Sequence, residues 1–225
     1  MALLKNFVAP ALPLPSDVYD RRTADELVRA LRLYFNLMDR YFVDTILDAF
    51  NGGLGGNTIT LPHIAASDST DQHTTDDTAT VVNFNTLDSG FGWTLNSPGS
   101  ATAAVAGVYT IRYSLQLANT DNAQHTATAW LQKNSVDVTN SATSFSVPAR
   151  KSASIPGFTT AYSEATFAVN VGDEIELYWA TDKANVVSPA ADGILLFHDA
   201  AQASPFARPA IPSVIGSIVW VSALP

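Results

Sequence analysis

The feature that most constrains this 225-residue chain is the alternation of apolar and polar residues in its second half. In the stretch GVYTIRYSLQLA (107–118), Tyr109, Ile111, Tyr113, Leu115 and Leu117 share one face of an extended strand. The stretches 126–138 and 159–182 continue this pattern, with turns predicted at residues 133–135 and 172–173, the second of them closing a hairpin. Such a succession of period-two segments favours a β-rich body.

Shorter strands complete the predicted body. They are expected at residues 58–64, 78–84, 92–95, 141–147, 193–198 and 217–222. Because polar turns and no helices separate these strands, the sequence predicts a mainly β fold, an antiparallel jelly-roll sandwich of about ten strands over residues 58–225.

The first fifty residues follow another pattern. Residues 1–19 read as a proline-rich extended arm that either docks on another protein or frays, and the docking candidates in it are Leu12, Leu14, Pro15 and Tyr19. An amphipathic helix is expected over residues 20–50, with a glycine-rich hinge at 51–57. Two overlapping apolar stripes follow the helix, and their candidate contact residues are Leu27, Leu31, Tyr34, Phe35, Met38, Tyr41 and Phe42.

These helix residues need cover, because burying about nine large apolar side chains contributes on the order of 15 kcal/mol before entropy is counted. Self-association in a short parallel bundle is the favoured cover. Packing on the chain's own β domain comes second. A helix lying on a membrane surface comes third, because its polar face carries nearly as many acids as bases.

Composition excludes several classes of function. The net charge of −9 argues against a nucleic-acid partner, since residues 51–225 hold six basic and fourteen acidic side chains, a balance of −8. The absence of cysteine excludes disulfides and zinc–thiolate sites. The start resembles no signal peptide and no stretch is long enough for a membrane span, so we expect folding in a cytoplasm without membrane insertion.

No catalytic, cofactor or metal site is predicted. The acidic stretch 67–78 lacks calcium-loop spacing and reads better as a solvated loop, and the four histidines are scattered. Glycoside hydrolysis needs two carboxylates that face each other, whereas Glu174 and Glu176 share one strand face. A Gly-X-Ser-X-Gly turn, which would present a serine nucleophile, is absent from the sequence. The polar loops 119–124 and 181–188 are either plain loops or receptor contacts for sugar hydroxyls, and the candidates are Asn119, Asp121, Asn122, Asp182 and Asn185.

The order GVYTIRYSLQL, KNSVDV, ATFAVNVGDEIELYW and GSIVWVSA resembles the ten-stranded jelly roll of the tumour-necrosis-factor-like and complement-globular-head superfamily, over roughly residues 58–224. That resemblance implies a compact homotrimer whose subunits press apolar flanks together. The residues that either supply this flank or fill the sandwich core are Tyr109, Tyr113, Tyr162, Tyr178 and Trp179.

The segment ALPLPSDVYDRRTADELVRALRLYFNLMDRYF, within residues 8–45, looks like the amino-terminal part of small virion structural proteins of tailed, particularly marine, bacteriophages. This resemblance implies a non-enzymatic head or tail fibre, with virion proteins as partners and a host-surface glycan as a further candidate. A capsid decoration or cement protein without a receptor is the alternative. A secreted cytokine-like ligand is disfavoured because secretory features are absent.

Overall fold

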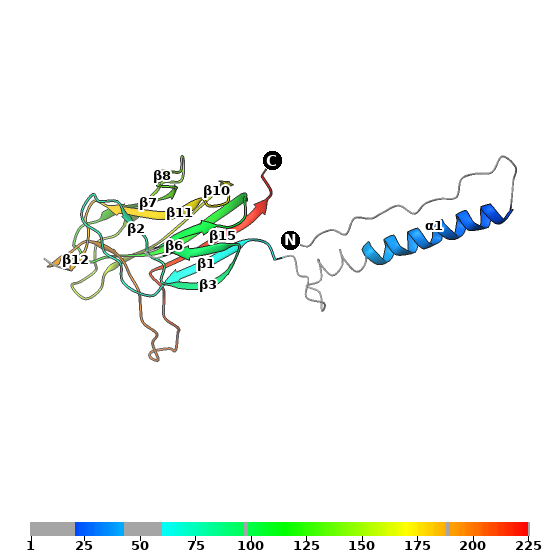
Figure 1. Ribbon diagram of the computed structural model, residues 1–225. Coiled ribbons are helices and arrows are strands. Elements are labelled where there is room, and N and C mark those ends of the chain that lie inside the picture. The colour runs from blue at the N-terminus through cyan, green and yellow to red at the C-terminus, as the bar shows by residue number, and fades with distance from the viewer. Residues whose placement is uncertain (1–20, 43–59, 97–98, 188–189, 225) are drawn as a thin grey trace. The chain divides into compact units, whose positions relative to one another are not determined.

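The computed structural model describes residues 21–42, 60–96, 99–187 and 190–224, and within the helix the side chains of residues 25–36 and 38 (Figure 1). The chain divides into two units between Thr60 and Leu61. The first contains α1 (Arg21–Phe42), and the second is a β domain. The expected arm residues Leu12, Leu14, Pro15 and Tyr19, the hinge and the end of the expected helix lie outside the described residues.

Helix α1 is amphipathic, as its sequence pattern predicts. Leu27, Leu31 and Tyr34 are half-buried, whereas Val28, Leu33, Phe35 and Met38 are exposed. The Tyr34 and Phe35 rings meet edge to face with centroids 5.8 Å apart. The side chains of Tyr41 and Phe42 lie outside the described set. Among the described residues, no helix combines the length and apolar character that crossing a bilayer requires.

The β domain is a sandwich of two antiparallel sheets (Figure 1). The six-stranded sheet has the order β10 (Gly157–Val169), β6 (Gly107–Asn119), β15 (Val214–Ser222), β1 (His63–Asp68), β3 (Thr86–Phe91), and β14 (Ile194–Leu196) pairs with β6. The seven-stranded sheet has the order β4 (Trp93–Asn96), β5 (Ser100–Ala103), β11 (Glu174–Thr181), β7 (His125–Lys133), β8 (Val136–Asp137), with β2 (Thr80–Val81) on β11 and β9 (Thr143–Val147) on β7. Strands β12 (Val186–Val187) and β13 (Ala190–Ala191) form a small ribbon.

The strand predictions succeed where alternation is strongest. In β6 the five predicted apolar residues are all buried, and they face Leu131, Ile175, Leu177 and Trp179 of the other sheet in one core. The turn expected at residues 133–135 is present, since Asn134 and Ser135 have positive φ values of 53° and 64°. The jelly-roll sandwich is therefore confirmed as the fold class.

The hairpin predicted around Gly172 is wrong. Strand β10 pairs with β6 and strand β11 pairs with β7, so the turn carries the chain from one sheet to the other. The turn itself is tight, because Asp173 N donates to Asn170 O at 3.1 Å and Gly172 adopts a φ of +85°. Val171, expected to alternate with Phe167 and Val169, is exposed at the turn.

The weaker strand predictions differ from the structure in the bounds of two strands, and two further strands were not predicted. The strand expected at 58–64 begins at His63, and the one expected at 78–84 shortens to β2. Strands β3 and β5 were not predicted, because TLDSGF is exposed throughout and SATA contains only small residues.

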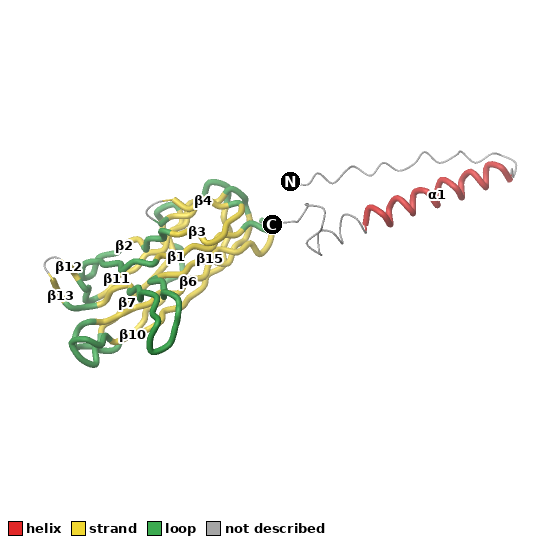
Figure 2. Tube along the Cα trace, turned by 90° about the horizontal axis from the view of Figure 1, so that it is seen from below, coloured by secondary structure: helices red, strands yellow, loops and turns green. Residues whose placement is uncertain are grey.

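The two ends of the sandwich differ. Trp220 N donates to Pro62 O at 3.1 Å, so the chain enters and leaves the domain at one end. The loops that follow β6 and β11, together with the β12–β13 ribbon, lie at the other end, which we call the apical end (Figure 2).

Candidate binding surfaces of the jelly roll

The outer face of the six-stranded sheet exposes many large apolar side chains. They are Phe91, Phe158, Tyr162, Ile215, Val219 and Val221. Of the exposed large apolar residues in the described part of the chain, only Val136 lies on a strand of the seven-stranded sheet. The two outer faces of the sandwich thus differ in character.

Strand register places these apolar residues in rows that cross the sheet. Ile215 lies opposite Ser114, which lies opposite Tyr162 on β10. Val219 lies opposite His63, which lies opposite Phe91 on β3. These rows form a continuous face, since cross-strand neighbours have Cβ atoms about 5 Å apart.

The polar groups on the same face pair with one another. Arg112 Nε donates to Glu164 Oε2 at 3.0 Å, and the Thr110 and Thr166 hydroxyls lie 2.8 Å apart. The ion pair is half exposed, so it contributes little to stability. Neutralised charges and short hydroxyls leave the face easy to desolvate.

The structure corrects most of the predicted aromatic flank. Tyr109, Tyr113 and Trp179 are 0%, 3% and 1% exposed, so they fill the core and offer nothing to a neighbouring subunit. Tyr109 packs edge-on against Trp93 with centroids 5.0 Å apart. Tyr178 lies half-buried on the outer face of the seven-stranded sheet. Tyr162, 57% exposed, is the one member that lies on the outer face of the six-stranded sheet.

At the apical end, His125 joins the two polar loops that hold the candidate receptor residues. Its Nε2 lies 2.8 Å from Asp121 Oδ2, and its Nδ1 lies 3.4 Å from Asp182 Oδ2. Burial by itself lowers the pKa of His125, but the hydrogen bonds and charges of Asp121 and Asp182 outweigh it and raise that pKa. The hydrogen bond from His125 holds the pKa of Asp121 below its usual value.

The predicted receptor residues are therefore mostly engaged within the chain. Asn119 is fully buried, so its assignment as a receptor contact is wrong, and its Nδ2 donates to the carbonyls of Ala123 and Pro148. Asn185 Nδ2 donates to Thr120 Oγ1 at 3.0 Å. Asn122 is exposed and stays a candidate.

This histidine makes stability depend on pH in a defined direction. A histidine with a raised pKa in the folded state stabilises fully below its ordinary value of 6.5, and this contribution is lost as pH rises through the folded pKa. We expect the melting temperature of the wild type to fall more than that of His125→Gln between about pH 5.5 and about pH 8.5. Asp121 does not contribute to this difference in melting temperature. Its pKa lies below the ordinary carboxyl value of 3.8, so its protonation changes stability only at lower pH. Parallel melting curves of the two proteins would contradict the assignment.

The acidic stretch 67–78 is exposed at residues 69–71 and 75–78, as expected of a solvated loop, but several of its carboxylates also bond to the rest of the domain. Asp68 is buried and accepts hydrogen bonds from Thr70 N and Asn85 Nδ2, and Asp71 accepts one from His198 N. Asp76 accepts from Ala184 N, which together with Lys183 lowers its pKa. These carboxylates fasten the loop to the sandwich. In the described part of the chain, no group of three or more acidic or histidine side chains is arranged so that it could hold a metal ion.

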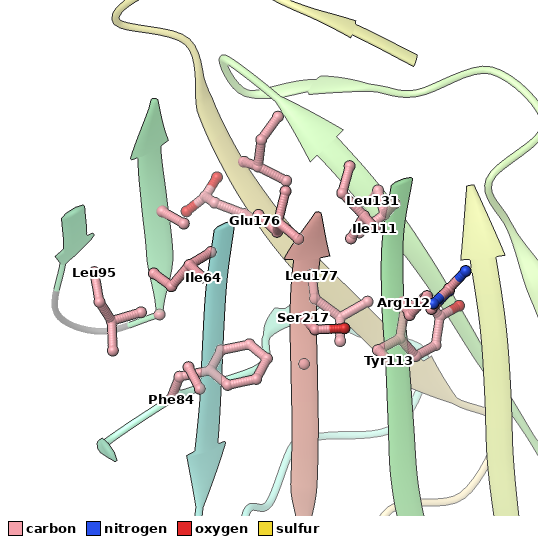
Figure 3. Close-up of a pocket in the computed structure, with 16 residues that line it drawn as sticks. Ile64, Phe84, Leu95, Ile111, Arg112, Tyr113, Leu131, Glu176, Leu177 and Ser217 are labelled. Carbon is pink, nitrogen blue, oxygen red and sulfur yellow. The ribbon is translucent and has the colours of Figure 1, made fainter. Parts of the chain in front are cut away.

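A cavity of about 50 Å³ lies between the sheets (Figure 3). Figure 3 shows Ile64, Phe84, Ile111 and Leu177 around it. Most of its lining is aliphatic or aromatic, so it is a packing defect of the core with little capacity to recognise a polar ligand.

Comparison with known proteins finds similarity to solved structures only. No family model matches the sequence, and no curated protein matches it. Among solved structures, the chain is similar to the structure of Eiger TNF from S. frugiperda, with a TM-score of 0.43 and 15% sequence identity. That alignment covers 73% of this chain and 96% of the other. That solved structure is of a TNF. The sandwich fold of the present chain is established by its own strand order.

Proposed function

We propose that this chain is a non-enzymatic, homotrimeric structural protein of a tailed-phage virion, a short head or tail fibre. The amino-terminal arm attaches it to the particle, and the jelly roll contacts the host surface. The observation that carries the proposal is the difference between the two outer faces of the sandwich, one apolar and one polar. The virion part is supported by the sequence resemblance of residues 8–45.

The apolar outer face is the surface that three subunits bury. Contiguous exposed apolar residues on a soluble domain mark a contact surface. Here Phe91 lies on β3 and both Ile215 and Val219 lie on β15, the strands on either side of β1, and polar groups on the same face are already paired. A trimer is the arrangement that the resemblance to the tumour-necrosis-factor-like superfamily implies.

The helix fits the same assembly. Val28, Phe35 and Met38 of α1 are exposed, and each large apolar side chain that becomes buried contributes about 1.5 to 3 kcal/mol. Three copies of α1 in a parallel bundle cover these residues while the arms reach the particle.

The trimer is tested by mass and by a charged variant. We expect the 225-residue chain to form a species of three times its 23.9 kDa mass in light scattering, and the double variant Ile215→Asp, Val219→Asp to give a smaller species. The matched control Thr128→Asp, Ser144→Asp places two charges on the outer face of the other sheet and should keep the wild-type mass. A wild-type protein with the mass of one chain at micromolar concentration would overturn the trimer.

Attachment and host binding are tested on particles. Removing residues 1–19 should abolish attachment to the virion without changing the number of subunits in the free assembly. If the protein instead acts as cement, its loss makes particles heat-labile and the purified protein binds no host cells.

A further inference from the structure

We propose that the outer face of the seven-stranded sheet binds a neutral saccharide against the Trp130–Tyr178 pair. This inference names a site and ligand class for host contact, and so rests on the proposed function. It moves the site away from the apical loops, where the polar groups of Asp121, Asp182 and Asn185 already bond within the chain.

The aromatic pair is built by strand register. Trp130 on β7 lies directly opposite Tyr178 on β11, the strands that run side by side in Figure 1. Their ring centroids are 6.0 Å apart with an angle of 27° between the planes. The neighbours Leu131, Leu177 and Trp179 point inward and are buried, so the two half-buried rings lie on the outer face. They form an apolar ridge on an otherwise polar surface.

The ridge is held in place before any ligand arrives. Trp130 Nε1 donates to Asp137 Oδ1 at 2.8 Å, and Gln132 Nε2 donates to the same oxygen at 2.9 Å. Asp137 comes from β8, which the turn at Asn134 and Ser135 brings alongside β7. A ring fixed in this way loses little conformational entropy on binding.

Hydrogen-bonding groups lie on both sides of the ridge. On one side, Glu176 lies opposite Gln132, which lies opposite Asp137. On the other side, the Thr128 and Ser144 hydroxyls lie 2.8 Å apart. Among the described residues, no partner is present for the Tyr178 hydroxyl, which is free to bond a ligand. A pyranose matches this surface, because its C–H face packs on aromatic rings while its hydroxyls bond at the rim.

Charge restricts the class of saccharide. The outward positions of β4, β5, β11, β7 and β9 hold Glu174 and Glu176 and no lysine or arginine. Burial and the charge of Glu174 raise the pKa of Glu176, so another anion nearby is unfavourable. Sialylated, uronic or sulfated glycans are therefore excluded. A cationic ligand is disfavoured, because two nearly parallel rings do not enclose a cation as an aromatic cage does.

The test titrates the full-length protein with neutral oligosaccharides of glucose, galactose and N-acetylglucosamine, and with sialylated and uronic-acid oligosaccharides. We expect binding of at least one neutral sugar, detected by calorimetry, and none of the anionic ones. Trp130→Ala and Tyr178→Ala should each weaken that binding about tenfold, the factor that corresponds to about 1.4 kcal/mol. Phe206→Ala removes an exposed aromatic ring that lies outside both sheets, so it is the matched control and should bind as the wild type does.

The outcomes separate this inference from the proposed function. Unchanged melting temperature and mass in Tyr178→Ala, with weaker sugar binding, support the site even if Trp130→Ala misfolds. Host cells that bind wild type and both variants equally leave the fibre role standing and overturn the site. A wild type that binds neither cells nor any neutral sugar overturns both. Preference for anionic glycans, or binding of a lysine-rich peptide in place of sugars, overturns the site.

Discussion

Replacing Gly157 by alanine is expected to cost about 3 kcal/mol or more, a large share of a domain's usual stability of about 5 to 15 kcal/mol. Gly157 is the first residue of β10 and pairs with Asn119 of β6. A Cβ atom at this position would overlap the carbonyl oxygen of Pro148 and lie 2.8 Å from that of Ala149. Both obstacles are backbone atoms, and Asn119 holds Pro148 in place with a hydrogen bond of 3.1 Å. Either the strand or the loop must move.

Gly90→Ala is the matched control for this substitution. Its Cβ atom would meet Leu87 Cδ1 at 3.4 Å and His63 O at 3.8 Å, which are ordinary contacts. We expect its free energy of unfolding to stay within about 0.5 kcal/mol of the wild type. Urea unfolding of the full-length proteins, followed by tryptophan fluorescence, measures both variants. A wild-type midpoint for Gly157→Ala would mean that the 148–149 segment does not cover β10.

Replacing Asn119 by aspartate is expected to destabilise the domain by about 3 to 5 kcal/mol, although the two side chains have nearly the same shape. The Asn119 amide nitrogen donates to Ala123 O at 2.8 Å and Pro148 O at 3.1 Å, and its oxygen accepts from Asp121 N at 2.9 Å. An ionised carboxylate has no proton to donate, so two acceptors would face a buried negative charge. The loss should shrink as pH falls, because a protonated carboxyl regains one donor.

Asn122→Asp makes the same chemical change three residues away, at an exposed position. We expect a change of no more than about 0.5 kcal/mol there. Thermal unfolding of both variants at neutral and acidic pH distinguishes a buried charge from a general effect of added charge. Equal losses in the two variants, or a loss that does not respond to pH, would refute the role given to Asn119.

Alternation in the sequence predicted the fold but did not reveal which face of a strand is inside. Tyr109, Tyr113 and Trp179 were placed correctly on shared strand faces, yet two sheets can bury either face, and the partner sheet decides. The same limit explains the turn at Gly172. Its residues fit a tight turn, but pairing across a sandwich is set by contacts between distant strands.

The candidate surfaces were harder to predict, because loop composition says little about which polar groups are already bonded. Asn119 and Asn122 lie in the same polar stretch, and only the fold shows that one is buried beneath the 148–149 segment while the other is exposed. The Trp130–Tyr178 pair lies 48 positions apart in the sequence. Its one signal was that both residues occupy polar-facing positions of predicted strands, where a large aromatic side chain is unexpected.

The position at which the chain enters the sandwich has a mechanical consequence. Residue Leu61 leads directly into β1, which is hydrogen-bonded along both edges, to β15 and to β3. Those bonds run perpendicular to the strand. Tension transmitted along β1 from a tether therefore acts in shear on the two rows of hydrogen bonds that join β1 to β15 and to β3. In shear many hydrogen bonds must break together, whereas peeling a strand away breaks them one at a time. A domain tethered through β1 is built to withstand pulling.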